Sequence, residues 1–124
     1  MNGSAVGWVL DAPDRARLLD RFPPRYPGVI AHHVTLWGHK KDAGLPPHAD
    51  LAVTGHADAG TGIEALVVSV DGDERRPDGN IFHCTWSLDP ARGLKPKDSN
   101  LLLRRHGWTA ISPLPFAATP GPVA

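Results

Sequence analysis

His33-Val34-Thr35-Leu36 and, fifty residues later, His83-Cys84-Thr85-Trp86 are the stretches that decide the fold of this 124-residue chain. Each places a histidine and a threonine one residue apart inside a run that alternates like a strand. Successive side chains of a strand point to opposite faces, so residues two apart share a face. In both stretches one face is therefore mostly apolar and suits a core, whereas the other presents a histidine and a threonine together. Two such strands predict the two halves of one site.

The doubled His-x-Thr-hydrophobic pattern resembles the 2H phosphoesterase superfamily, which includes 2′,3′-cyclic phosphodiesterases and RNA 2′-phosphodiesterases. The resemblance implies two lobes of largely antiparallel sheet, with helices outside and a cleft between them. It also implies that His33 and His83 are catalytic, that Thr35 and Thr85 bind the substrate, and that the reaction uses no metal or other cofactor. The implied substrate is a nucleotide or an RNA-end phosphate.

The chemistry of phosphodiester cleavage explains why these residue types belong together. A nucleophile must lose a proton, a leaving oxygen must gain one, and the phosphoryl oxygens must be held. Histidine, with an ordinary pKa of about 6.5, serves as base or acid near neutrality. One of His33 and His83 would be the base and the other the acid, and the sequence leaves this assignment open. The hydroxyls of Thr35 and Thr85 would donate hydrogen bonds to the non-bridging oxygens.

Two further residues near the first motif are candidates for binding the substrate. Strict alternation places Trp37 on the face of His33, where its indole could stack on a base. Lys40 follows in the next loop and could bind a second phosphate. The other basic pairs, Arg75-Arg76 and Arg104-Arg105, are typical of solvated surface.

A zinc site is an alternative for a chain with seven histidines. Zinc needs three or four nitrogen, sulfur or carboxylate ligands in a tetrahedral cluster, and neither His-x-x-x-His nor Cys-x-x-Cys occurs. The spacing therefore disfavours a metal site. Cys84 lies on the predicted apolar face, which disfavours a role as nucleophile. By the same alternation, His32 is predicted to lie on the core side as a structural histidine.

The composition is that of an ordinary globular protein, with 41% hydrophobic and 21% charged residues. The formal net charge is zero, which argues against binding of a long RNA along its length. A single cysteine rules out an internal disulfide and suits a reducing compartment. The sequence shows no apolar run long enough to cross a bilayer and no signal-peptide pattern. We expect a cytoplasmic monomer that does not bind membranes.

The length favours one domain over residues 1–124, with a loose proline-rich tail from about residue 113. Helix signals predict one helix between Asp11 and Pro23-Pro24. They also predict a shorter helix that Asp98-Ser99 can cap, that holds residues 101–105 and that ends at Gly107. Apolar alternation predicts strands over residues 5–10, 29–37, 51–57, 63–70, 81–88 and 108–112. The last three strands before residue 90 should form an antiparallel meander. These elements predict an α+β fold with a mostly antiparallel sheet and two peripheral helices.

The function that these observations favour is a metal-independent phosphoesterase that acts on cyclic nucleotides or RNA-end phosphates. A non-catalytic module that binds a nucleotide or RNA end in the same cleft is the main alternative. A structural domain in which the two motifs are coincidental is a third possibility.

Overall fold

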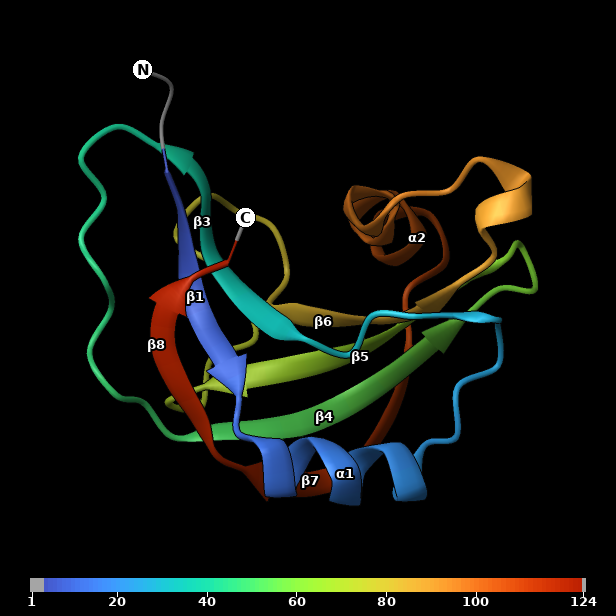
Figure 1. The fold of residues 1–124 in the computed structure, drawn as a ribbon, viewed down its shortest axis with the longest axis horizontal. Coiled ribbons are helices and arrows are strands. Elements are labelled where there is room, and N and C mark those ends of the chain that lie inside the picture. Colours follow the sequence, from blue (N-terminus) through green and yellow to red (C-terminus); the bar gives the residue numbers. More distant parts are fainter. Residues whose placement is uncertain (1–3, 124) are drawn as a thin grey trace.

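The computed structural model describes residues 4–123 as an α+β fold of two antiparallel sheets and two α-helices (Figure 1). The small sheet has three strands in the order β3-β1-β8, and the large sheet has five in the order β2-β6-β5-β4-β7. The predicted fold class is confirmed. The elements are β1 Ser4–Leu10, α1 Ala12–Arg21, β2 Gly28–Val29, β3 His33–Lys40, β4 Leu51–Asp58, β5 Ile63–Val70, β6 His83–Leu88, the 3₁₀ turns η1 Pro90–Arg92 and η2 Pro96–Asp98, α2 Ser99–His106, β7 Thr109–Phe116 and β8 Ala118–Pro122.

The large sheet is covered on both faces, which explains the continuous apolar run of its central strand β5. On one face, Leu66 and Val68 pack in the main core with residues of the small sheet and α1. On the other face, Ile63 and Val67 pack in a second core with Leu102 and other residues near α2. Figure 1 accordingly shows α1 and α2 on opposite sides of the large sheet. The predicted meander of β4, β5 and β6 is confirmed.

A corner at Ala31 carries the chain from the large sheet to the small one. Ala31 is fully buried and has φ 42°, a left-handed conformation that is uncommon for a residue other than glycine. Just before the corner, the N–H groups of Ile30 and Ala31 donate to the carbonyls of Trp86 and Thr85, each over 3.0 Å. After the corner, β3 pairs with β1 instead. The prediction of one strand over residues 29–37 is therefore wrong, because this segment divides into β2 and β3 in different sheets.

The corner also determines where the backbone and side chain of His32 lie. The backbone N–H of Leu10 donates to the His32 carbonyl over 3.0 Å, and the His32 side chain is exposed. Its Nδ1 lies 3.0 Å from Nδ1 of His33. The prediction that His32 lies on the core side is wrong, because strand alternation does not continue through the corner.

The C-terminal segment forms strands, so the prediction of a loose tail from residue 113 is wrong. β7 runs through Pro113 to Phe116 and pairs with β4, whereas the predicted last strand ended at residue 112. β8 then pairs with β1 along five residues. Both strands lie at the edges of their sheets, where proline is tolerated because one side of the strand needs no hydrogen-bond partner.

Both predicted helices are present. α1 begins directly after Asp11 and carries proline in its first turn, as expected for a helix N-terminus. Its Leu18 is almost completely buried in the main core. α2 begins at Ser99, within the predicted cap pair Asp98-Ser99, and ends at Gly107, whose φ of 67° suits glycine.

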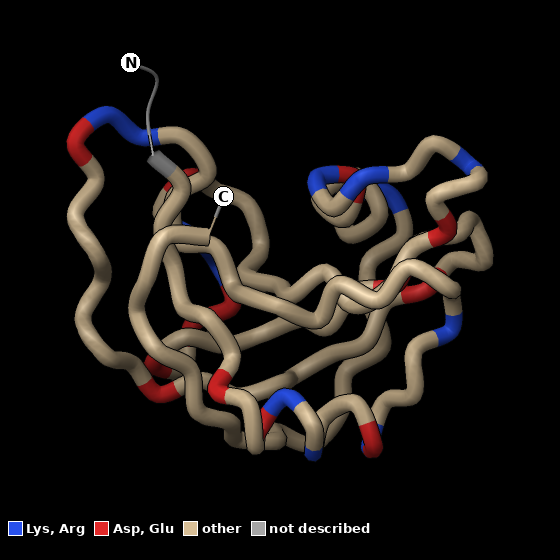
Figure 2. Tube along the Cα trace, viewed as in Figure 1, with Lys and Arg blue, Asp and Glu red and all other residues tan. Residues whose placement is uncertain are grey.

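Charged residues of both signs are interspersed along the trace of the chain (Figure 2), in keeping with a formal net charge of zero. Over residues 4–123, neither helix has the length and apolarity needed to cross a membrane.

Candidate functional site

The two motifs line one cavity of about 350 Å³. The first motif comes from β3 in the small sheet, and the second comes from β6 in the large sheet. Their intervening residues, Val34 and Cys84, are buried in the main core. The structure therefore brings together the four motif side chains that the sequence predicts as one site: His33, Thr35, His83 and Thr85.

His83 is held in one orientation by its own chain. Its Nδ1 lies 2.8 Å from the Ile81 carbonyl, so Nδ1–H is the donor and Nε2 is the nitrogen left for a ligand. Burial of the imidazole lowers the pKa of His83, and the positive charge of Arg76 lowers it further. The bond to Ile81 and the charge of Asp78 act in the opposite direction on this pKa. An imidazole with a fixed Nδ1 is a suitable base through Nε2.

His33 lies beside two other imidazoles. Burial, together with the neighbouring His32 and His83, lowers the pKa of His33 to about 4. Its Nδ1 contacts Nδ1 of His32 over 3.0 Å, which leaves Nε2 for other interactions. The two rings are arranged edge to face, with centroids 5.2 Å apart.

The lowered pKa values of His33 and His83 determine how the cavity would respond to an anion. Near pH 7 the unliganded site holds His33 neutral, and the pKa of His83 is also lowered. A bound anion would favour the protonated form of either ring, because an opposite charge within about 4–6 Å raises the pKa of a histidine. Anion binding is accompanied by proton uptake where the anion raises one of these pKa values to near the ambient pH.

The two motif threonines differ in what their hydroxyls contact. Thr85 Oγ1 donates to the Pro96 carbonyl over 3.1 Å and shares a 2.8 Å hydrogen bond with Ser99 Oγ. Thr85 is also buried beneath α2. Thr35 is half-buried, and within residues 4–123 its hydroxyl makes no hydrogen bond to another residue. Thr35 is therefore the motif hydroxyl that is free to donate to a ligand.

Trp37 and Lys40 do not line the cavity. A β-bulge interrupts the pairing of β3 with β1, since Val6 pairs with Trp37 whereas the next residue, Gly7, pairs with Thr35. The extra residue shifts the alternation, so the predicted placement of Trp37 on the motif face is wrong. Lys40 Nζ lies 4.2 Å from the centre of the Trp37 ring, a cation–π contact. The predicted binding roles of this pair have no support in the cavity geometry.

Sequence reasoning missed several polar residues that complete the cavity. The sequence pattern places Arg76 on the solvated surface with its neighbour Arg75, yet Arg76 is only 7% exposed. No local pattern distinguishes the two arginines, because a turn decides which one points inward. The other polar residues of the lining come from β3 and from the segment before and within α2: His39, Lys97 and Asn100.

Within residues 4–123, no group of three or more His, Cys, Asp or Glu side chains has an arrangement that could hold a metal ion. Cys84 lies in the main core, as the sequence predicts. Burial raises the pKa of the Cys84 thiol to about 12, so the reactive thiolate is disfavoured near pH 7.

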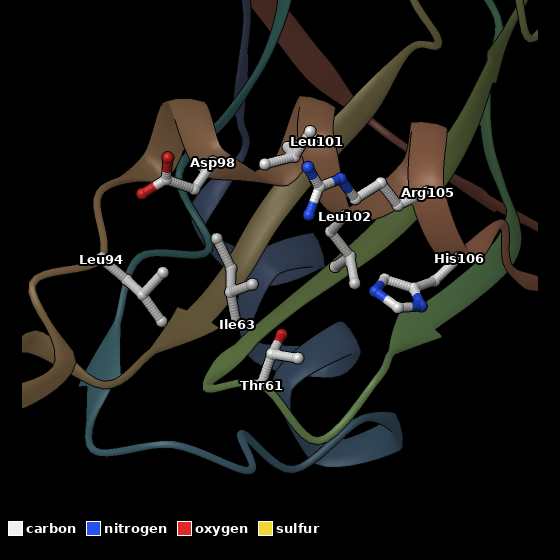
Figure 3. Close-up of a pocket in the computed structure, with 8 residues that line it drawn as sticks. All are labelled: Thr61, Ile63, Leu94, Asp98, Leu101, Leu102, Arg105 and His106. Atoms are coloured by element: carbon white, nitrogen blue, oxygen red, sulfur yellow. The ribbon is translucent and has the colours of Figure 1, made fainter.

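A second cavity lies beside α2, away from both motifs (Figure 3). Apolar side chains, including Ile63 and Leu102, form much of its lining, and Arg105 and His106 project from α2. The lining does not combine two neighbouring imidazoles with a free hydroxyl as the motif cavity does. The motif cavity is therefore the stronger candidate for a functional site.

Comparisons of the chain with family models, with curated proteins and with solved structures each found no match. The functional argument therefore depends on the geometry and chemistry of the site.

Proposed function

We propose that the chain is a metal-independent phosphoesterase that acts on a 2′,3′-cyclic nucleotide or an RNA-end phosphate. The observation that supports this most is that His33 and His83, from different sheets, line one cavity together with Thr35. A cavity of about 350 Å³ is in the size range of small-molecule sites, about 300–1,000 Å³. We also propose that the protein is cytoplasmic, since the single cysteine is buried and suits a reducing compartment. We propose a monomer as its oligomeric state.

The two imidazoles supply the proton transfers of hydrolysis. One accepts a proton from water as the water oxygen bonds to phosphorus. The phosphorus bond to the ribose 2′ or 3′ oxygen breaks, and the other ring, protonated, donates its proton to that oxygen. The product is a phosphomonoester, and the two histidines have exchanged protonation states. Thr35 donates to a non-bridging oxygen.

A specific observation favours the alternative, a non-catalytic module that binds a nucleotide or RNA end. Catalysis needs one imidazolium, but the pKa of His33 is about 4 and that of His83 is lowered. The enzyme proposal therefore requires the substrate's own negative charge to raise one of these pKa values on binding. A binding module has no such requirement.

Turnover separates the two proposals. The purified protein is incubated with the four 2′,3′-cyclic nucleotides in excess chelator, and the products are resolved as 2′- or 3′-phosphates. Replacing His33 or His83 by alanine should lower turnover by about 10²–10⁴, the usual contribution of a positioned acid or base. The double variant should lose less than the product of the two single losses, because both rings serve one reaction.

His48→Ala is a matched control, since His48 is exposed and lies outside the motif cavity. It should turn over the substrate as the wild type does. If the wild type hydrolyses none of the four nucleotides, yet binds them with an affinity that the histidine variants retain, the binding module replaces the enzyme.

A further inference from the structure

Arg76 is a buried cation at the wall of the motif cavity. Its side chain is 6% exposed, and the residue lines the cavity with His33 and His83. The turn that carries it is held by its backbone, because Arg76 N–H donates to the Asn80 carbonyl over 2.7 Å. Its Nη2 donates to Asp78 Oδ2 over 2.6 Å. The contact with Asp78 therefore holds the guanidinium at the cavity wall beside the two histidines.

The hydrogen bonding of this guanidinium is incomplete. Within residues 4–123, two buried side-chain polar atoms have no hydrogen-bond partner, Arg76 Nε and Asn100 Oδ1. Both residues line the motif cavity. A buried donor or acceptor without a partner costs about 1–3 kcal/mol, so native structures seldom keep one without a reason. One donor and one acceptor at the same cavity suit a ligand that offers both an anionic oxygen and a hydroxyl or amino group.

The phosphate also needs a donor that the second motif does not supply. A cyclic phosphodiester has two non-bridging oxygens, and Thr35 offers one free hydroxyl. The hydroxyl of Thr85 is already bonded to Pro96 and Ser99. We propose, on the basis of the function proposed above, that Arg76 binds the substrate phosphate in place of Thr85, through a small reorientation of the guanidinium about its contact with Asp78 that turns the unpartnered Nε–H towards the cavity. Thr85 instead anchors η2 and α2 to β6.

The chemistry of Arg76 fits this role better than that of Lys97, the lysine that lines the same cavity. A guanidinium carries its charge at every accessible pH and presents several N–H donors in a planar fork that matches a phosphate. Lys97 also lines the cavity, but its side chain is exposed and less restrained. Arg76 is held by Asp78 and by its turn, so less conformational freedom is lost when a ligand binds.

Turnover of the cyclic nucleotides by Arg76 variants tests the proposal, with Arg75→Gln as the matched control. Arg75 is exposed, lies outside the motif cavity, and loses the same charge one residue away. Arg76→Gln should lower kcat/KM by about 10²–10³, the usual loss when one transition-state donor is removed. Arg76→Lys should recover part of this loss, and Arg75→Gln should leave kcat/KM unchanged. Circular dichroism of each variant confirms the fold.

A measurement on the wild type decides the matter if Arg76→Gln does not fold. Inorganic phosphate is titrated into isotope-labelled protein, and the Nε–Hε resonances of the arginines are followed by NMR. Saturable movement of the Arg76 resonance, with the Arg75 resonance unmoved, supports the proposal. An unmoved Arg76 resonance overturns it, as does a folded Arg76→Gln variant with wild-type kcat/KM. Failure of the wild type to hydrolyse any cyclic nucleotide overturns the phosphoesterase instead, and the phosphate titration still decides whether Arg76 binds the anion.

Discussion

Acidification should destabilise the unliganded protein through His33. The pKa of His33 is about 4 in the folded protein, whereas an unperturbed histidine, as in the unfolded chain, has a pKa of about 6.5. Between these two pH values the unfolded chain binds a proton that the folded protein does not. The free energy of unfolding is therefore unaffected by His33 above about pH 6.5. It falls as the pH is lowered from there towards 4.

The size of this loss follows from the two pKa values. The full difference between the unfolded and folded pKa values of His33 corresponds to about 3 kcal/mol, since each pKa unit is about 1.4 kcal/mol. His33 is only half-buried, and solvent screening reduces the contribution to about 1–2 kcal/mol. His32 and His83 contribute part of the effect, because each disfavours a positive charge on His33.

Denaturant unfolding at a series of pH values measures this loss, with His33→Gln as the comparison. The substitution leaves every other titrating group in place, so the difference between the two stability curves isolates His33. The variant should lose about 1–2 kcal/mol less than the wild type between pH 7 and pH 4. Saturating phosphate should reduce the difference, because the anion favours protonated His33. Parallel curves for the two proteins in the absence of phosphate would refute the reasoning.

Three other predictions follow from the same geometry. Trp86→Ala should lower the free energy of unfolding by about 3–5 kcal/mol, because Trp86 is fully buried and its Nε1 donates to the Phe22 carbonyl. A loss below about 1 kcal/mol would contradict its place in the core. Thr85→Val should cost about 1–3 kcal/mol, because it removes a hydrogen-bond partner of the buried Ser99 hydroxyl. Thr35→Val should change stability by less than about 0.5 kcal/mol, and equal losses would count against the assigned contacts. The pH dependence of kcat/KM reports the pKa values of the free protein. Its optimum should lie below about pH 6.5, because the pKa values of His33 and His83 are both lowered. An optimum above pH 7.5 would show that these two histidines are not the titrating pair.

Strand alternation predicted much of the site because it depends on local geometry alone. Val34, Cys84 and Trp86 are buried, as their positions in the two motifs require, and the histidines and threonines beside them line the cavity. Alternation holds wherever the strand pairs regularly. It fails at Ala31 and in the β-bulge after Thr35, which explains the errors at His32 and Trp37.

The C-terminal strands show a different limit of sequence reasoning. Proline and glycine indicate breaks in local structure, so the segment from residue 113 was expected to be loose. Whether such a segment pairs depends on an available strand edge elsewhere in the fold. Here β4 and β1 each offer an edge, and β7 and β8 complete the two sheets. The partners lie far away in the sequence, and no local pattern identifies them.

The two motifs are alike in sequence but unlike in their chemistry, because their strands occupy different places in the fold. β3 lies at the edge of the small sheet, and its Thr35 remains free. β6 lies between β2 and β5 in the large sheet, and α2 with η2 covers its Thr85. The same asymmetry fixes the Nδ1 of His83 on a backbone carbonyl, whereas that of His33 contacts another imidazole. A repeated motif therefore predicts which residues meet, but the donors that a phosphate would find, Thr35 and Arg76, follow only from the packing around each strand.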